Sequence, residues 1–181
     1  METERQLLEA IHSGDRAALR RLYDRYAGYA MAVALRYTPE PDQARDVLQD
    51  SFVRILTAVS RFSYHGEGSL KAWVARIVSN CAINSLRQQQ RFLLTDDLPD
   101  TPDEEEAPSL DDLSPDTLMR LIARLPDNYR TVLNLFVFER CSHRDIARLL
   151  SIKESTSSSL LFRARKALAR LITQDLTIDA L

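Results

Sequence analysis

Hydroxyl and basic side chains gather between residues 142 and 170 in an arrangement suited to binding DNA. Two apolar-periodic segments, 143–150 and 154–172, are separated by the short turn Ser151-Ile152-Lys153. This spacing is typical of a helix-turn-helix, in which the second helix lies in the major groove. The side chains that could contact DNA are Arg144, Ser155, Thr156, Ser157, Ser158, Arg163, Arg165 and Lys166.

The two ends of this motif supply different contacts. Ser142 is expected to cap the first helix, with Asp145 reaching back to its backbone. Hydroxyls at the start of the second helix can donate to phosphates together with free backbone amides, and the basic residues supply the attraction that dominates affinity. A helical hairpin with a solvated basic end is the alternative, because Arg and Lys near a helix C-terminus also complement its dipole.

The sequence contains no pattern typical of a catalytic or metal site. Cys141 and His143 are two potential metal ligands, too few for a zinc site. A nucleophile–base arrangement and a glycine-rich phosphate-binding loop are both missing from the sequence. We therefore expect a protein that is not an enzyme and has no metal or cofactor.

Charge is divided into three blocks along the 181 residues. Residues 1–91 contain 13 Lys and Arg against 10 Asp and Glu, and residues 120–172 contain 11 against 4. Residues 92–119 contain 10 acidic residues and no basic one. The formal net charge of -2 therefore hides two basic segments separated by an acidic one, and it is a poor guide to partners.

Cysteine usage and hydropathy indicate the compartment. Cys81 and Cys141 are the only cysteines and lie in different segments, so a disulfide framework is not expected. No apolar run approaches the roughly 20 residues needed to cross a bilayer, and the N-terminus lacks a signal-peptide core. We expect a cytoplasmic protein with no direct membrane insertion.

Helical periodicity and scarce glycine predict an all-α protein: two small helical domains joined by a flexible acidic linker, the C-terminal one a helix-turn-helix. The expected boundaries are 1–91, 92–114 and 115–175. We expect helices at about 4–12, 15–37, 42–59, 69–91, 115–125, 127–138, 143–150 and 154–172, and a loop at 60–68. The inward face of the third helix is expected to contain Ala44, Val47, Leu48, Phe52, Ile55, Leu56 and Val59. Residues 176–181 have no assignment.

Several segments together resemble the extracytoplasmic-function (ECF) group of the bacterial sigma-70 family. Residues 40–54, EPDQARDVLQDSFVR, resemble the second conserved region, and they are followed by LKAWVARIVSN at 70–80 and AINSLR at 82–87. Residues 125–132, LPDNYRTV, and the helix-turn-helix resemble the fourth region. The intervening third domain of larger sigma factors is missing, as in the ECF group.

The resemblance implies that one acidic face binds the clamp helices of the largest subunit of RNA polymerase. Asp46, Gln49 and Asp50 lie at helical spacings of three and four, so they share a face. Carboxylates suit a basic partner because complementary charge speeds and orients association. Without the surrounding motif, an ordinary solvated face would be the preferred interpretation.

The resemblance also implies that the loop at 60–68 and the following helix open and recognise the −10 strand of a promoter. Single-strand recognition uses aromatic surfaces and groups that bond base edges, while basic side chains hold phosphates. Trp73 is interpreted as core packing that shapes this site, and Asn84 stands where the family usually has Asp. The candidate residues are Phe62, Tyr64, His65, Arg76, Asn80, Asn84 and Arg87.

In the fourth region the resemblance places the second helix of the motif in the −35 element. Relatives often carry Lys or Arg where this chain has Ser158 and Leu160, and a polar residue where it has Phe162. Base recognition would then depend on serine hydroxyls and apolar contacts to thymine methyls, or Leu160 or Phe162 packs inward. We expect a weak −35 preference.

The implied function is that of a sigma factor, which binds core RNA polymerase and directs promoter-specific transcription initiation. Its implied partners are core polymerase, promoter DNA and an anti-sigma factor. By resemblance the acidic linker threads the polymerase channel that later carries RNA, and a solubilising spacer is the alternative. A helix-turn-helix regulator acting on duplex DNA without polymerase is the main competing function, but it leaves residues 41–91 unexplained. An all-helical enzyme with an incidental basic hairpin is the other.

Overall fold

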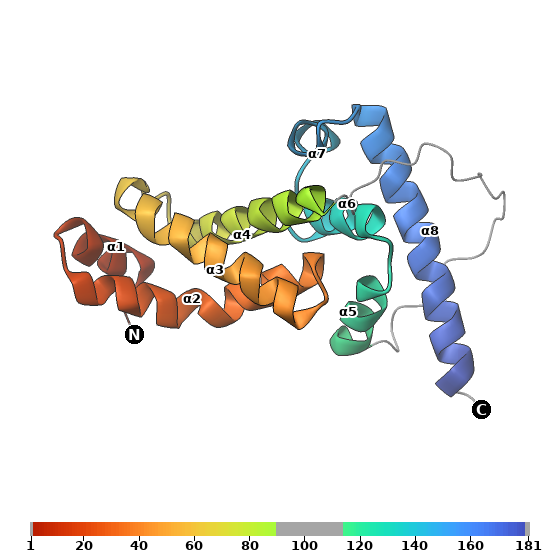
Figure 1. Cartoon of the computed structure of the whole chain (residues 1–181), viewed down its shortest axis with the longest axis horizontal. Coiled ribbons are helices and arrows are strands. Elements are labelled where there is room, and N and C mark those ends of the chain that lie inside the picture. Colours follow the sequence, from red (N-terminus) through yellow and green to blue (C-terminus); the bar gives the residue numbers. More distant parts are fainter. Residues whose placement is uncertain (1, 90–113, 180–181) are drawn as a thin grey trace. The chain divides into compact units, whose positions relative to one another are not determined.

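The structure, a computed structural model, describes residues 2–89 and 114–179. The chain divides into two compact units, Met1–Gln88 and Gln89–Leu181, each built from helices (Figure 1). Within the described ranges there is no strand, so the all-α fold class is confirmed. The expected acidic linker lies, apart from Ser114, outside the described residues.

The first unit is a bundle of three long helices with a short helix across one end. Its elements are α1 (Glu4–His12), α2 (Arg16–Tyr37), α3 (Pro41–Ala58), the 3-10 turn η1 (Val59–Arg61) and α4 (Ser69–Gln88). Helices α2, α3 and α4 pack against one another in pairs, and α1 lies against α2 and η1 (Figure 1). Thr3 and Gln6 form a capping box for α1, and Asp15 accepts a hydrogen bond from the Ala17 amide to start α2.

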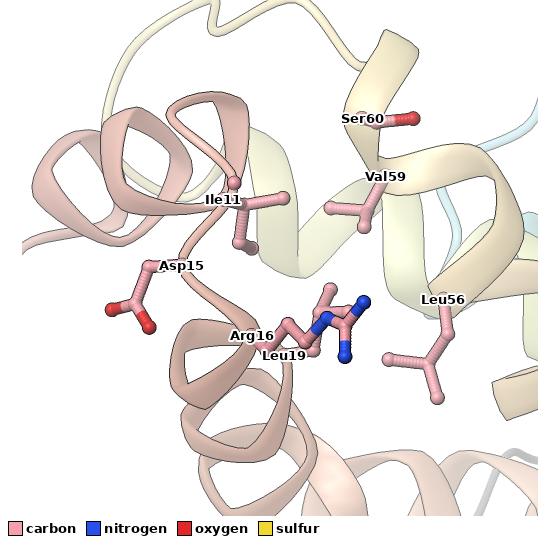
Figure 2. A pocket seen from close by; sticks show the side chains of 8 residues that line it. Ile11, Asp15, Arg16, Leu19, Leu56, Val59 and Ser60 are labelled. Atoms are coloured by element: carbon pink, nitrogen blue, oxygen red, sulfur yellow. The ribbon is translucent and has the colours of Figure 1, made fainter.

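The core of this unit is built from the apolar faces that periodicity indicates. Fully buried members include Leu7, Leu22, Val33, Tyr37, Ile55, Leu70, Val74 and Leu86. Leu56 was expected to face inward, but 36% of it is exposed. The reason is local, because the chain turns into η1 after Ala58 and Leu56 stands at the rim of a surface hollow beside Val59 (Figure 2).

The second unit contains the expected four helices, three of which pack around one long helix. They are α5 (Pro115–Ala123), α6 (Asp127–Val137), α7 (His143–Leu150) and α8 (Glu154–Asp179), and α8 packs against the other three (Figure 1). Ser114 caps α5, with Pro115 at its first position. Helix α8 continues seven residues beyond the expected end, since no Gly or Pro stops it there and Asp175 pairs with Arg120 of α5 at 3.2 Å.

A buried arginine holds the turn between α5 and α6. Arg130 is 3% exposed, and its guanidinium donates to the carbonyl oxygens of Ala123 at 3.1 Å and Leu125 at 2.6 Å. It also forms an ion pair with Asp127. The arginine thus satisfies carbonyl groups that the end of a helix leaves without partners, and it fixes the direction in which α6 leaves α5.

No helix among the described residues has the length and apolar character needed to span a membrane.

Candidate nucleic-acid and partner interfaces

Helix α3 presents an exposed face with acidic character. Asp46, Gln49 and Asp50 are all exposed there, while Val47 of the same helix is buried. The structure therefore brings the three predicted residues together. Sequence reasoning missed Val53, which is 63% exposed and follows Asp50 by three residues on the same face. The sequence did indicate that Val53 is exposed, because it is an apolar residue that does not belong to the inward face of α3.

The loop before α4 presents aromatic side chains. Phe62 packs against Trp73 with ring centroids 5.0 Å apart. Trp73 was expected in the core, but both rings are half-buried, and Trp73 supports the loop from beneath Phe62 rather than from the core. Tyr64 and His65 are exposed. Partial desolvation and the nearby Glu67 carboxylate raise the pKa of Tyr64, so its hydroxyl, already a hydrogen-bond donor at neutral pH, stays protonated to higher pH.

The predicted residues of α4 form a stripe that continues from this loop. Arg76, Asn80, Asn84 and Arg87 follow one another by three or four residues, which places them on the same helical face as Trp73. Asn80 is half-buried and the other three are exposed. Two amide groups able to bond base edges are thus flanked on each side by a guanidinium group able to hold a phosphate.

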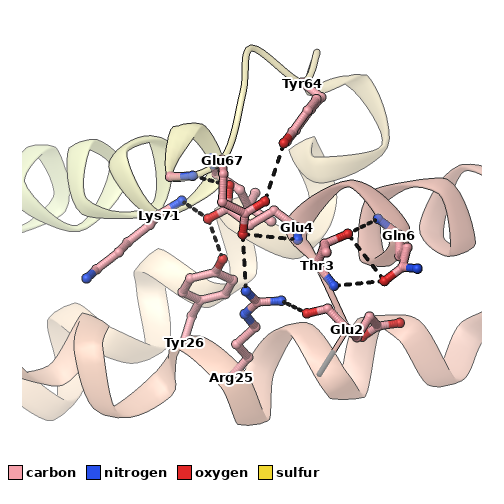
Figure 3. Close-up of polar contacts among 11 residues, drawn as sticks. Glu2, Thr3, Glu4, Gln6, Arg25, Tyr26, Tyr64, Glu67 and Lys71 are labelled. Atoms are coloured by element: carbon pink, nitrogen blue, oxygen red, sulfur yellow. Dashed lines mark hydrogen bonds and ion pairs between the residues drawn. The ribbon is translucent and has the colours of Figure 1, made fainter.

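Two carboxylates make hydrogen bonds at the end of the aromatic loop, one from α1 and one from the loop itself (Figure 3). Glu4 of α1 is 2% exposed, and its oxygens accept hydrogen bonds from the Tyr26 hydroxyl at 2.8 Å and from three backbone amides. The amides belong to Gly68 at 2.9 Å, Leu70 at 3.1 Å and Lys71 at 3.1 Å. Burial and the bond to Glu4 raise the pKa of Tyr26, so it remains a donor.

The second carboxylate, Glu67, belongs to the loop itself. It accepts a hydrogen bond from the Tyr64 hydroxyl at 3.3 Å and lies 3.7 Å from the Arg25 guanidinium of α2 (Figure 3). Sequence reasoning missed both Glu4 and Glu67. The sequence did contain one indication that α4 is capped from elsewhere. The residue before Ser69 is a glycine, which has no side chain able to cap the helix.

Helix α7 and the turn that follows it have the predicted boundaries, and α8 begins where predicted but ends later. Ser142 caps α7, because its hydroxyl oxygen accepts a hydrogen bond from the Asp145 amide at 3.2 Å. The Asp145 carboxylate was expected to accept from the Ser142 backbone, but it accepts from the Ser142 hydroxyl at 2.6 Å. Ser151 ends α7 in the left-handed conformation, with φ 57° and ψ 43°. Helix α8 then begins at Glu154.

The start of α8 divides the predicted DNA-binding residues between its faces. Ser155, Ser158 and Arg165 are exposed on one face together with Phe162, which is 69% exposed. Thr156, Arg163 and Lys166 are half-buried, and Arg144 is exposed on α7. The sequence left open whether Leu160 or Phe162 packs inward. Leu160 does, with 5% of the residue exposed.

Ser157 does not lie where the sequence placed it. Its side chain is fully buried, and its hydroxyl lies 3.0 Å from Nδ1 of His143 on α7. It therefore offers no surface to a phosphate. The reason is helical geometry: Ser157 is four residues before Leu161 and seven before Ala164, both of which pack inward.

A hollow of about 130 Å³ between α1, α2 and α3 is apolar over much of its lining (Figure 2). Ile11, Leu19, Leu56 and Val59 border it, and the carboxylate on its edge, Asp15, caps α2 and pairs with Arg21 at 3.2 Å.

Among residues 2–89 and 114–179, no group of three His, Cys, Asp or Glu side chains could hold a metal ion.

Comparisons with known proteins match both units. Residues 22–92 match sigma-70 region 2, and residues 116–168 match sigma-70 region 4. The RNA polymerase sigma-H factor of Pseudomonas aeruginosa is 29% identical over 94% of each chain. The ECF RNA polymerase sigma-E factor of Escherichia coli K12 is 30% identical over 92% of each chain.

The fold also resembles that of a solved structure. The sigma factor RpoE of Bartonella quintana, in complex with the anti-sigma factor NepR, is 20% identical with a TM-score of 0.53, covering 85% of this chain and 96% of that one. The two regional matches and the full-length relatives agree in the order of their parts. The chain belongs to the sigma-70 family of RNA polymerase sigma factors, in its ECF group.

Proposed function

We propose that the two units of this sigma factor recognise two promoter elements, and that the first unit also binds core RNA polymerase. The chain directs transcription initiation by binding core polymerase and promoter DNA. We assign core binding and the recognition and melting of the −10 element to residues 1–91. Residues 115–175 are assigned to the −35 element, and residues 92–114 to an acidic linker.

The proposed core-binding surface is the exposed face of α3. Asp46, Gln49 and Asp50 give it negative charge, and the exposed Val53 adds an apolar contact. Interfaces gain specificity and association rate from charge complementarity and gain affinity from buried apolar groups. A basic partner surface with an apolar pocket would fit this combination.

The proposed −10 surface begins at the aromatic loop and continues along α4. Tyr64 and His65 are exposed rings on which an unstacked base can lie, and the Asn80–Asn84 stripe can bond base edges. Arg76 and Arg87 would hold the backbone of the strand. The proposed −35 surface is the α8 face formed by Ser155, Ser158, Phe162 and Arg165.

One observation favours a sigma factor over a regulator that acts without polymerase. The acidic face of α3 and the aromatic loop occur in the same unit, separate from the helix-turn-helix. A duplex-binding regulator needs neither surface, whereas a promoter-melting subunit of polymerase needs both.

The test is a pull-down of the full chain with core polymerase, followed by run-off transcription. Templates would be chosen by mapping transcript 5′ ends after overexpression, since aligned start sites expose both promoter elements. We expect a stable complex that initiates at discrete sites. Binding to duplex DNA without association with core polymerase would instead support a regulator.

Three further assignments follow from the role as a polymerase subunit. The protein acts in the cytoplasm, where core polymerase transcribes. It is not an enzyme, because the chemistry of RNA synthesis belongs to polymerase. An anti-sigma factor is a candidate partner, since the structurally similar RpoE was solved with one, and the α3 face is the surface that such a protein would cover.

A further inference from the structure

The first turn of α4 lacks a capping side chain of its own. Gly68 precedes Ser69, the first residue of α4, and glycine has no side-chain acceptor. The amides at the start of a helix need acceptors from elsewhere. Glu4 supplies them from 64 residues away in the sequence, with Oε2 bonded to the amides of Gly68 and Leu70 and Oε1 to that of Lys71 (Figure 3).

The energetics favour a carboxylate at this place. A helix N-terminus carries partial positive charge, and bonds between amides and an ionised carboxylate are stronger than those between neutral groups. Burial at 2% exposure protects these bonds from water and salt. Glu4 therefore fastens α1 to the first turn of α4.

The loop that depends on this cap is the proposed −10 loop. Gly66 and Gly68 have φ values of +111° and +89°, so the loop contains two positions with wide conformational freedom. The Phe62–Trp73 contact fixes the beginning of the loop, and Glu4 fixes its end. A loop held at both ends presents Tyr64 and His65 in one arrangement before the strand arrives, which lowers the entropy cost of binding.

Glu4 also occupies a site that would otherwise attract phosphate. Free amides at a helix N-terminus bind anions, and a DNA strand is a chain of phosphates. With the carboxylate bonded there, the amides of Gly68, Leu70 and Lys71 are already used. The strand is thus left to interact with the side chains of the loop and of the α4 stripe.

We propose that Glu4 is a positioning residue for −10 strand recognition, acting through the loop that it caps rather than by touching DNA. Residue 4 precedes residues 22–92, which match region 2, so the family match does not assign this role. The inference rests on the proposed function of the loop, and the experiment separates the two.

The test compares Glu4→Gln with Glu9→Gln in the full chain bound to core polymerase. Both variants remove one negative charge from α1, but Glu9 is exposed and only pairs with Arg5 at 3.0 Å on the surface. The probe is a fluorescent oligonucleotide carrying the non-template −10 strand of a mapped promoter, alongside versions with each −10 base substituted. Core affinity and the hydrogen exchange of the Gly68, Leu70 and Lys71 amides are measured on the same proteins.

We expect Glu4→Gln to weaken strand binding by about tenfold, because a neutral amide replaces the acceptor of several charge-assisted bonds. The preference for the −10 strand over substituted strands should also shrink, and the three amides should exchange faster. Core affinity should stay within about twofold. Glu9→Gln should match the wild type in every measurement. Strand affinity and discrimination equal to those of Glu9→Gln would overturn the inference.

Glu4→Asp is a second variant, which tests the inference if Glu4→Gln does not fold. It keeps the charge but shortens the side chain by one carbon, so we expect an intermediate loss of strand affinity. Faster exchange of the three amides with unchanged strand discrimination would overturn the inference. If the wild type and Glu9→Gln holoenzymes show no preference for the −10 strand, the proposed function of the loop fails instead.

Discussion

The hydroxyl of Ser157 lies 3.0 Å from Nδ1 of His143, and this contact joins the two helices of the helix-turn-helix. The His143 ring in turn stacks on Phe136 of α6, with ring centroids 4.9 Å apart. One polar contact thus connects α8 to α7 and, through the ring, to α6. The five consecutive hydroxyl residues near the start of α8, at positions 155–159, therefore differ in their surroundings, with Ser157 in the core and Ser158 on the surface.

Alanine substitutions should separate the roles of these two serines. Ser157→Ala should destabilise the second unit by about 1 kcal/mol, because it removes the hydrogen bond between a buried hydroxyl and the half-buried imidazole of His143. Ser158→Ala should leave stability unchanged and weaken binding to promoter duplex, since its hydroxyl faces outward. Calorimetry of the full chain and fluorescence anisotropy with a −35 duplex would measure the two effects. The opposite pattern would show that α8 is rotated relative to α7.

Ser151 predicts a stabilising substitution. It ends α7 with φ 57°, a conformation that costs an ordinary residue about 1–2 kcal/mol and glycine almost nothing. Ser151→Gly should therefore raise the stability of the second unit by about 0.5–1 kcal/mol. Ser159→Gly is the matched control, because the same change inside α8 should destabilise by about 0.5 kcal/mol. A lower melting temperature for Ser151→Gly would contradict the account.

Local signals explain why most of the fold could be predicted from the sequence. Asp15, Ser114-Pro115 and Ser142 are caps whose effect depends on residues within one turn, and each begins a helix as expected. Periodicity identified the buried helix faces because it, too, depends only on residues close together in the sequence. The end of α8 was missed because a helix with no stop signal is extended by a distant contact, here between Asp175 and Arg120.

The parts of the site that were missed depend on contacts between distant segments. Nothing within one turn of Glu4 shows that its carboxylate meets amides 64 residues later. Ser157 looked like its neighbours, because its burial depends on how α8 is rotated against α7. By contrast, Asp46, Gln49 and Asp50 could be grouped from spacing alone, since their shared face is a property of one helix.

Phe162 and Leu160 predict separate effects on DNA binding and on stability. Leu160→Ala should destabilise the second unit by about 2–4 kcal/mol, because a buried side chain leaves a cavity. Phe162→Ala should cost little stability, since 69% of the residue is exposed, and it should weaken duplex binding. The measurements are thermal unfolding and anisotropy with the same duplex. Equal losses of stability for both variants would be inconsistent with an outward Phe162.

Uracil substitution tests which group Phe162 contacts. Replacing a thymine with uracil removes only the 5-methyl group, whose burial is worth about 0.8 kcal/mol or roughly fourfold in affinity. We expect one −35 thymine at which this change weakens the wild-type protein but not Phe162→Ala. If every thymine responds equally in both proteins, Phe162 does not contact a methyl group.

The acidic face of α3 predicts a charge-dependent affinity for core polymerase. Asp50→Lys should weaken that affinity by about 10- to 100-fold, because it places like charges across a complementary interface. Asp24→Lys is the matched control, since Asp24 is an exposed residue of α2 whose ion pair with Arg20 contributes little. Added salt should weaken the wild-type complex more than a complex of Asp46→Asn/Asp50→Asn, because screening acts on the charges that the double variant lacks. Equal losses for Asp50→Lys and Asp24→Lys would show that net charge, rather than this face, governs association.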